Sequence, residues 1–154
     1  TLFPYTTLFR SRFRMAGFAQ RREHALAQVR EWLIESAKGG ALKGFGVSAA
    51  DAEGITIGGA RQTWEDFAIR QQGLSFRIFN TLLADDQGAW GLSTLRRAEL
   101  AIGARQFVLR YFGATMLEKS KSLRDMMDRL KAVADRLPAT RAALGRLEPQ
   151  GSGE

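Results

Sequence analysis

A seven-residue repeat of apolar side chains in the last third of the chain constrains the fold more than any other feature. Residues seven apart lie on one side of an α-helix, and a strict period of seven makes that side wrap around a partner helix. The repeat predicts one long helix from Ser93 to Leu137, packed against another helix of the same chain or of a second copy. The heptad seam consists of Leu95, Ile102, Leu109, Met116, Leu123, Leu130 and Leu137.

The length of this helix has consequences for assembly. At a rise of about 1.5 Å per residue, residues 93–137 would span roughly 65 Å, whereas a helix over Ala16–Lys38 would span only about 35 Å. Part of the heptad seam would then lack cover within the chain, so we expect self-association through it. A bend is easiest near Gly113, and Pro138 ends the helix because proline removes a backbone donor. Whether residues 93–137 form one helix or two stays open.

Two shorter helices are predicted upstream of the seam. The first runs from Ala16 to Lys38 and ends at Gly39-Gly40, because glycine readily adopts the left-handed conformation that closes a helix. The second runs from Thr63 to Ala84, and the Thr63 hydroxyl can accept a hydrogen bond from its first turn. Gly73 inside this helix indicates close approach of another helix. The apolar face of the first helix contains Phe18, Ala25, Leu26, Val29, Leu33 and Ala37.

The glycine-rich stretch between these two helices carries the weakest signals. Ser48-Ala-Ala-Asp51 is typical of a helix start, and Ile55-Thr-Ile57 is flanked by glycine on both sides. We expect a single helical turn followed by one short extended piece, and one strand without an evident partner does not predict a sheet. The sequence therefore predicts an all-α fold, an elongated antiparallel bundle of about three main helices with a long C-terminal helix that can bend.

The chain is expected to contain one domain and two tails. Residues 1–11 look like the in-frame translation of a sequencing adaptor oligonucleotide, so we interpret them as a non-native tail and exclude them from fold reasoning. Met15 is then a start or an internal methionine. Residues 12–147 are predicted to form a single helical domain, because about 140 residues is a usual domain size. Residues 148–154 are expected to form a flexible tail.

The residue counts exclude several kinds of chemistry. The chain has no cysteine and only one histidine, His24, so a zinc site or a helical di-metal site lacks ligands. His24 lies in a strongly charged stretch without an identifiable serine and acid partner. The glycine run Gly39–Gly46 lacks the spacing of a phosphate-binding loop. We therefore predict no catalytic residue, no metal site and no cofactor, and an enzyme with no recognisable site ranks third among the functions considered.

No uninterrupted apolar run approaches the roughly 20 residues that a membrane-crossing helix needs. The sequence accordingly predicts no integral membrane association, and we expect a cytoplasmic location.

Positive charge is concentrated in the last third of the chain. Residues 93–147 contain twelve Lys or Arg and five Asp or Glu, whereas residues 12–92 contain ten and nine. Such a basic stripe favours nucleic acid, because each neutralised phosphate releases a counterion. The cations with the fewest acids near them in sequence are the predicted phosphate contacts: Arg105, Arg110, Lys119, Lys121 and Arg124.

Two functional hypotheses follow from this charge pattern. The first is a non-catalytic accessory or scaffold protein whose basic C-terminal helix contacts DNA or RNA. The alternative is a helical protein–protein adaptor or structural module, in which the charges serve only solubility. The expected partners are thus DNA or RNA, a second copy of the chain, or a helical protein.

Overall fold

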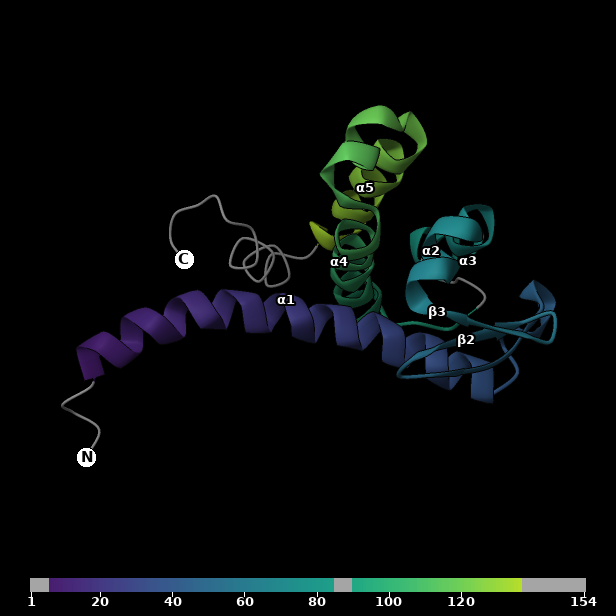
Figure 1. The fold of residues 1–154 in the computed structure, drawn as a ribbon, viewed down its shortest axis with the longest axis horizontal. Coiled ribbons are helices and arrows are strands. Elements are labelled where there is room, and N and C mark those ends of the chain that lie inside the picture. The colour runs from purple at the N-terminus through teal and green to yellow at the C-terminus, as the bar shows by residue number, and fades with distance from the viewer. Residues whose placement is uncertain (1–5, 85–89, 137–154) are drawn as a thin grey trace.

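The computed structural model describes residues 6–84 and 90–136, with side chains described for residue 17 and from residue 19 onward. Figure 1 shows α1 as a long helix, a small sheet beside its C-terminal part, α4 running across α1, and α5 returning along α4. The elements in chain order are α1 (Thr6–Lys38), the 3-10 turn η1 (Lys43–Phe45), β1 (Val47–Asp51), β2 (Gly54–Ile57), β3 (Ala60–Thr63), α2 (Trp64–Arg70), α3 (Gln72–Leu83), α4 (Thr94–Lys119) and α5 (Lys121–Ala134).

The prediction of an all-α antiparallel bundle with about three main helices is wrong. The described residues form five α-helices and a three-stranded antiparallel sheet in the order β1-β2-β3. The strands are four or five residues long, and only Val47, Gly54 and Ile55 in them are buried. Strands this short, with so few apolar positions, show little alternation of apolar and polar residues, so the sequence pattern does not reveal them.

Turn geometry builds the sheet where the sequence indicated only one extended piece. Gly58 and Gly59 both have positive φ, 58° and 82°, which suits the two-residue hairpin turn that joins β2 to β3. Ser48–Asp51, interpreted as a helix start, lies in β1 instead and pairs with β2. The Ile55-Thr-Ile57 strand therefore has a partner on each side.

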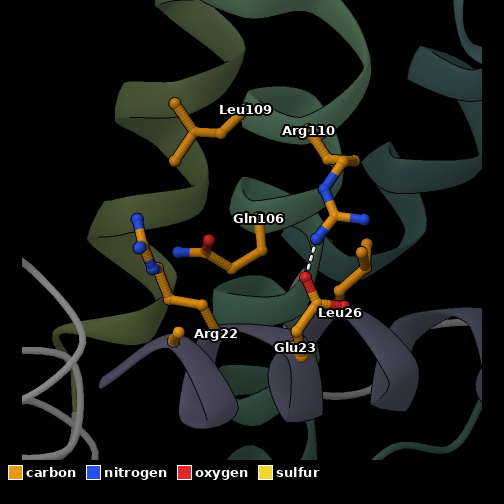
Figure 2. A pocket seen from close by; sticks show the side chains of 7 residues that line it. Arg22, Glu23, Leu26, Gln106, Leu109 and Arg110 are labelled. Carbon is orange, nitrogen blue, oxygen red and sulfur yellow. Dashed lines mark ion pairs between the residues drawn. The ribbon is translucent and has the colours of Figure 1, made fainter. Parts of the chain in front are cut away.

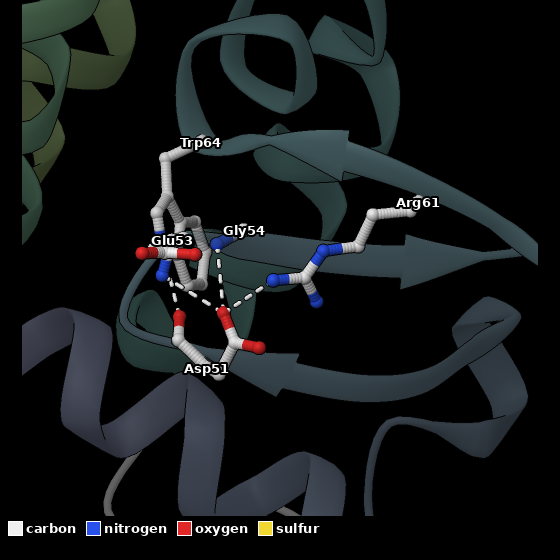
Figure 3. Close-up of polar contacts among 5 residues, drawn as sticks. All are labelled: Asp51, Glu53, Gly54, Arg61 and Trp64. Carbon is white, nitrogen blue, oxygen red and sulfur yellow. Dashed lines mark hydrogen bonds and ion pairs between the residues drawn. The ribbon is translucent and has the colours of Figure 1, made fainter.

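Asp51 at the end of β1 joins three elements (Figure 3). Its Oδ1 atom accepts hydrogen bonds from the backbone N–H groups of Glu53 and Gly54, at 2.8 and 3.1 Å. The Arg61 guanidinium of β3 donates to the same oxygen at 2.5 Å. The Trp64 indole, at the start of α2, donates to the backbone oxygen of Asp51 at 3.0 Å. Asp51 thereby links the turn between β1 and β2 to β3 and to α2.

These contacts give Asp51 a testable pH dependence. The hydrogen bond from Arg61, followed by that from the Glu53 backbone, holds the pKa of Asp51 below its ordinary value of 3.8. Because the folded state has the lower pKa, the stabilisation is complete above pH 3.8 and is lost as the pH falls through the lowered pKa. Arg61→Gln is expected to raise the pKa of Asp51 toward 3.8 in an NMR titration of its carboxyl carbon. An unchanged pKa in this variant would contradict the dominant role of Arg61.

The apolar face predicted for the first helix is confirmed where its side chains are described. Ala25, Leu26, Val29, Leu33 and Ala37 are all buried. The helix ends at Lys38, as predicted. It begins at Thr6, so residues 6–11 of the suspected adaptor tail are helical. Their side chains lie outside the described set, as does that of Phe18, and the assignment of the tail stays a prediction.

The helix predicted over Thr63–Ala84 is two helices. Its start is confirmed, because the Thr63 hydroxyl accepts a hydrogen bond from the backbone N–H of Asp66 at 3.0 Å. Gln71 then leaves the helical conformation, with φ −113° and ψ 44°, and separates α2 from α3. The break allows residues of both helices to reach the same ring of α4, that of Phe107. The rings whose centroids lie between 4.7 and 6.2 Å from that of Phe107 are Trp64, Phe67, Phe79 and Tyr111.

The helix predicted over 93–137 is interrupted and folds back on itself. Gly113, with φ 77° and ψ 169°, kinks α4 where a bend was expected. Ser120 then ends α4, and its hydroxyl accepts from the backbone N–H of Leu123 at 3.2 Å, which caps the start of α5. The expected rod of roughly 65 Å is replaced by a helical hairpin, so the overhang that predicted self-association is absent. Residues 137–154, including Pro138 and the predicted C-terminal tail, lie outside the described part.

The reversal also divides the heptad seam. Ile102, Leu123 and Leu130 are buried, whereas Leu95, Leu109 and Met116 are exposed by 51%, 39% and 38%. Between residues 97 and 108, α4 is buried on nearly every side, because α1, α2, α3 and α5 all pack around it. A helix covered on all sides needs no seven-residue seam.

Close helix packing occurs at Gly103 and not at Gly73. A Cβ atom on Gly103 would overlap the backbone oxygen of Ala25 in α1, whereas nothing lies within 4 Å of a Cβ on Gly73. The expectation for Gly73 was wrong because α3 presents this residue to solvent. Only a residue without a side chain lets α4 cross α1 this closely.

Gly103→Ala is expected to lower the free energy of unfolding by about 1–3 kcal/mol, because the new methyl group forces α1 and α4 apart. Gly73→Ala is the matched control and should raise the free energy of unfolding by up to about 1 kcal/mol, since alanine favours the helix. Urea denaturation measures both. Equal responses at the two positions would rule out the close crossing.

Candidate functional site

The five predicted phosphate contacts do not form one stripe. Arg105 and Arg110 lie on α4 in the part that crosses α1, with Arg105 half-buried and Arg110 exposed. Lys119, Lys121 and Arg124 are exposed where α4 turns into α5. We refer to these last three residues as the basic corner.

Two side chains of the basic corner are engaged within the protein. The Lys121 ammonium donates to the Asp125 carboxylate at 2.8 Å, one helical turn away. Arg124 Nη1 donates to the backbone oxygens of Leu117 and Glu118, at 2.9 and 2.5 Å. These carbonyls belong to the last turn of α4, whose C-terminal carbonyl groups lack helical partners. Arg124 therefore stabilises the corner itself.

A pocket lies where α1 and α4 cross (Figure 2). Its volume is about 330 Å³, which is near the lower end of the range for small-molecule sites. It combines hydrocarbon walls with four polar side chains. The lining residues are Ala19, Arg22, Glu23, Leu26, Gln106, Leu109 and Arg110.

Gln106 is the unusual residue of this pocket. The residue as a whole is only 7% exposed, and its side chain makes no hydrogen bond with any residue that the structure describes. Figure 2 shows this amide in the middle of the pocket, between Arg22 on one side and Arg110 on the other. None of the buried side-chain atoms without a partner belongs to Gln106, so its amide is in contact with solvent in the pocket.

An ion pair closes one side of the pocket. The Arg110 guanidinium of α4 contacts the Glu23 carboxylate of α1. With Arg22 on the opposite side, the lining carries two cations and one anion. Leu26 is buried and Leu109 is 39% exposed, and together they provide the apolar surface.

Sequence reasoning identified one residue of this pocket as functional, Arg110, and missed Arg22, Glu23 and Gln106. Gln106 lies between the seam residues Ile102 and Leu109 without being one of them, and Arg22 and Glu23 are more than eighty positions away from it in the chain. They meet only because Gly103 allows α1 and α4 to cross closely. No sequence signal that we identified would have found this group.

Within residues 6–84 and 90–136, no three His, Cys, Asp or Glu side chains are grouped so that they could hold a metal ion. In the same described ranges, no helix is long and apolar enough to span a membrane. No protein-family model, curated protein or solved structure matches this chain.

Proposed function

We propose that this protein is a non-catalytic helical accessory protein whose basic corner contacts the phosphates of DNA or RNA. The observation that carries the proposal is the gathering of Lys119, Lys121 and Arg124, all exposed, at the end of the α4–α5 hairpin that points away from α1 (Figure 1). The formal net charge of +7 adds a long-range attraction for polyanions.

The internal contacts of the corner are compatible with phosphate binding. An exposed ion pair such as Lys121 with Asp125 contributes only about 0–1 kcal/mol, so a phosphate can replace the carboxylate at little cost. Arg124 uses one nitrogen for the backbone of α4, and a guanidinium has further N–H donors. Arg105 and Arg110 lie away from the corner, so the proposal rests on three of the five residues identified in the sequence.

The test replaces two cations of the corner without touching the helix cap. Lys119→Gln combined with Lys121→Gln is expected to weaken binding to a labelled DNA duplex by at least about tenfold at low salt, and to reduce the salt dependence by about two counterions. Fluorescence anisotropy between about 50 and 200 mM salt gives both quantities. Circular dichroism should show unchanged helicity.

The matched control removes the same charge elsewhere. Lys38→Gln combined with Lys43→Gln changes two exposed lysines near the C-terminal end of α1 and should leave most of the affinity intact. Equal losses in both double variants would mean that net charge alone attracts the nucleic acid and that the corner is not a site. A wild-type protein that binds neither DNA nor RNA at about 50 mM salt would refute the function.

A helical protein–protein adaptor is the second candidate function. The observation in its favour is the exposure of Leu95, Leu109 and Met116, three apolar residues of the heptad seam on the outside of α4. Exposed apolar side chains of this size favour contact with a partner surface when they lie together. Sedimentation of the wild type and of Met116→Glu tests the simplest case, a second copy: the wild type should associate and the variant should not.

A further inference from the structure

We infer that the basic corner binds single-stranded nucleic acid and holds one unpaired base in a pocket beside the phosphate contacts. The inference rests on the proposed function, contact of the corner with phosphates, and specifies the kind of nucleic acid. Its starting observation is that Lys121 and Arg124 of the basic corner also line a pocket of about 360 Å³, which we call the corner pocket. It lies between the end of α4 and the first part of α5, and its lining residues are Leu117, Lys121, Arg124, Asp125, Met127 and Asp128.

Apolar side chains from both helices form part of the corner pocket. Leu117 from α4 is half-buried and Met127 from α5 is only 8% exposed, and both pack against the core. Bases that leave the helical stack are held in pockets between aromatic or apolar side chains. The bases of a duplex have their faces covered by stacking, so only an unpaired base can enter. A volume near the lower end of the range for small-molecule sites is enough for one base.

The charges of the corner pocket fit a nucleotide better than a bare anion. Lys121 and Arg124 can contact the phosphates next to the inserted base, because the exposed pair of Lys121 with Asp125 is replaced at little cost. Asp128 is exposed and makes no hydrogen bond or ion pair with any residue that the structure describes. An ionised carboxylate only accepts hydrogen bonds and repels phosphate, whereas it can accept from the N4 amino group of cytosine. Asp128 therefore favours the edge of a cytosine base in this pocket.

Labelled strands of about 12 nucleotides test these preferences by fluorescence anisotropy. The wild type should bind oligo(dC) at least about fivefold more tightly than a mixed-sequence duplex of the same length, because an inserted base adds to the phosphate contacts. A corner that contacts phosphates alone should prefer the duplex, whose charge density is higher. Oligo(dT), whose base presents O4 in place of the amino group, should bind at least about threefold more weakly than oligo(dC).

Asp128→Ala tests the base contact, because the two hypotheses predict changes of opposite sign. The substitution removes a negative charge, so phosphate contact alone predicts tighter binding of every probe. Base contact predicts that oligo(dC) binds at least about threefold more weakly, while binding of the duplex is unchanged or tighter. Oligo(rC) carries the same base and should be weakened equally, and the tighter of the two wild-type complexes identifies DNA or RNA as the ligand. Circular dichroism should show unchanged helicity, because Asp128 is exposed.

Glu118→Ala is the matched control, since it removes the same charge from an exposed residue next to Lys119 but outside the corner pocket. It should leave the binding of oligo(dC) unchanged or make it tighter. The inference is overturned if Asp128→Ala behaves in the same way, or if the wild type binds oligo(dC) no more tightly than the duplex. In both cases binding of the duplex would still support the proposed function. A wild-type protein that binds neither single strands nor duplex at about 50 mM salt would refute both proposals.

Discussion

Phe107→Ala is expected to lower the free energy of unfolding by about 3–5 kcal/mol, the range for removal of a fully buried aromatic ring. Phe107 is completely buried in the middle of α4. The four rings around it come from α2, α3 and α4 itself. Edge-to-face contacts of this kind add to the gain from burial. Loss of the ring would leave a cavity where these three helices meet.

Urea denaturation measures this effect, with Phe76→Ala as the matched control. Phe76 in α3 is only half-buried against the same core, so its loss should cost markedly less. A Phe107→Ala variant that unfolds at the same urea concentration as the wild type would show that the aromatic cluster does not hold α2 and α3 to α4. The slope of free energy against urea should be unchanged, because the unfolding transition still exposes nearly the same surface.

Leu123→Ala should cost about 2–5 kcal/mol, as expected for a buried leucine. Leu123 is fully buried on α5 against α4, whereas Leu109, two steps earlier in the same heptad seam, is 39% exposed. Leu109→Ala should therefore cost markedly less than Leu123→Ala, because 39% of the Leu109 surface is already exposed to solvent. Both substitutions remove the same side-chain atoms. A difference between the urea midpoints of the two variants therefore shows that Leu109 and Leu123 are buried to different extents, as the chain reversal at Ser120 requires.

A continuous helix would give a different result. If residues 93–137 formed one rod with a covered seam, Leu109 and Leu123 would be equivalent and both variants would be strongly destabilised. Equal losses of more than about 2 kcal/mol at both positions would contradict the hairpin. The measurement requires only the two single variants and the wild type.

Several features of the fold follow from the chemistry of neighbouring residues, and the sequence predicted them correctly. The apolar face of α1 follows from a helical period that the core then covers. Thr63 and Ser93 start helices because a short side-chain oxygen can accept from a free backbone N–H of the first turn, as both do. Gly113 permits the kink because only glycine takes a positive φ without steric cost. Each of these features depends on residues close together in the chain.

Long-range packing decided the rest. The break at Gln71 and the return of α5 at Ser120 both bury apolar residues against α4 that continuous helices would leave exposed, and no local signal measures that gain. The sheet depends on the pairing of β1 and β3 with the two edges of β2, which no local pattern of the sequence encodes. The pocket exists because α1 crosses α4 at Gly103 and brings Arg22 and Glu23 to Gln106. A one-dimensional pattern records the period of each helix, whereas only the tertiary structure decides which helices meet and which side chains are left without a partner.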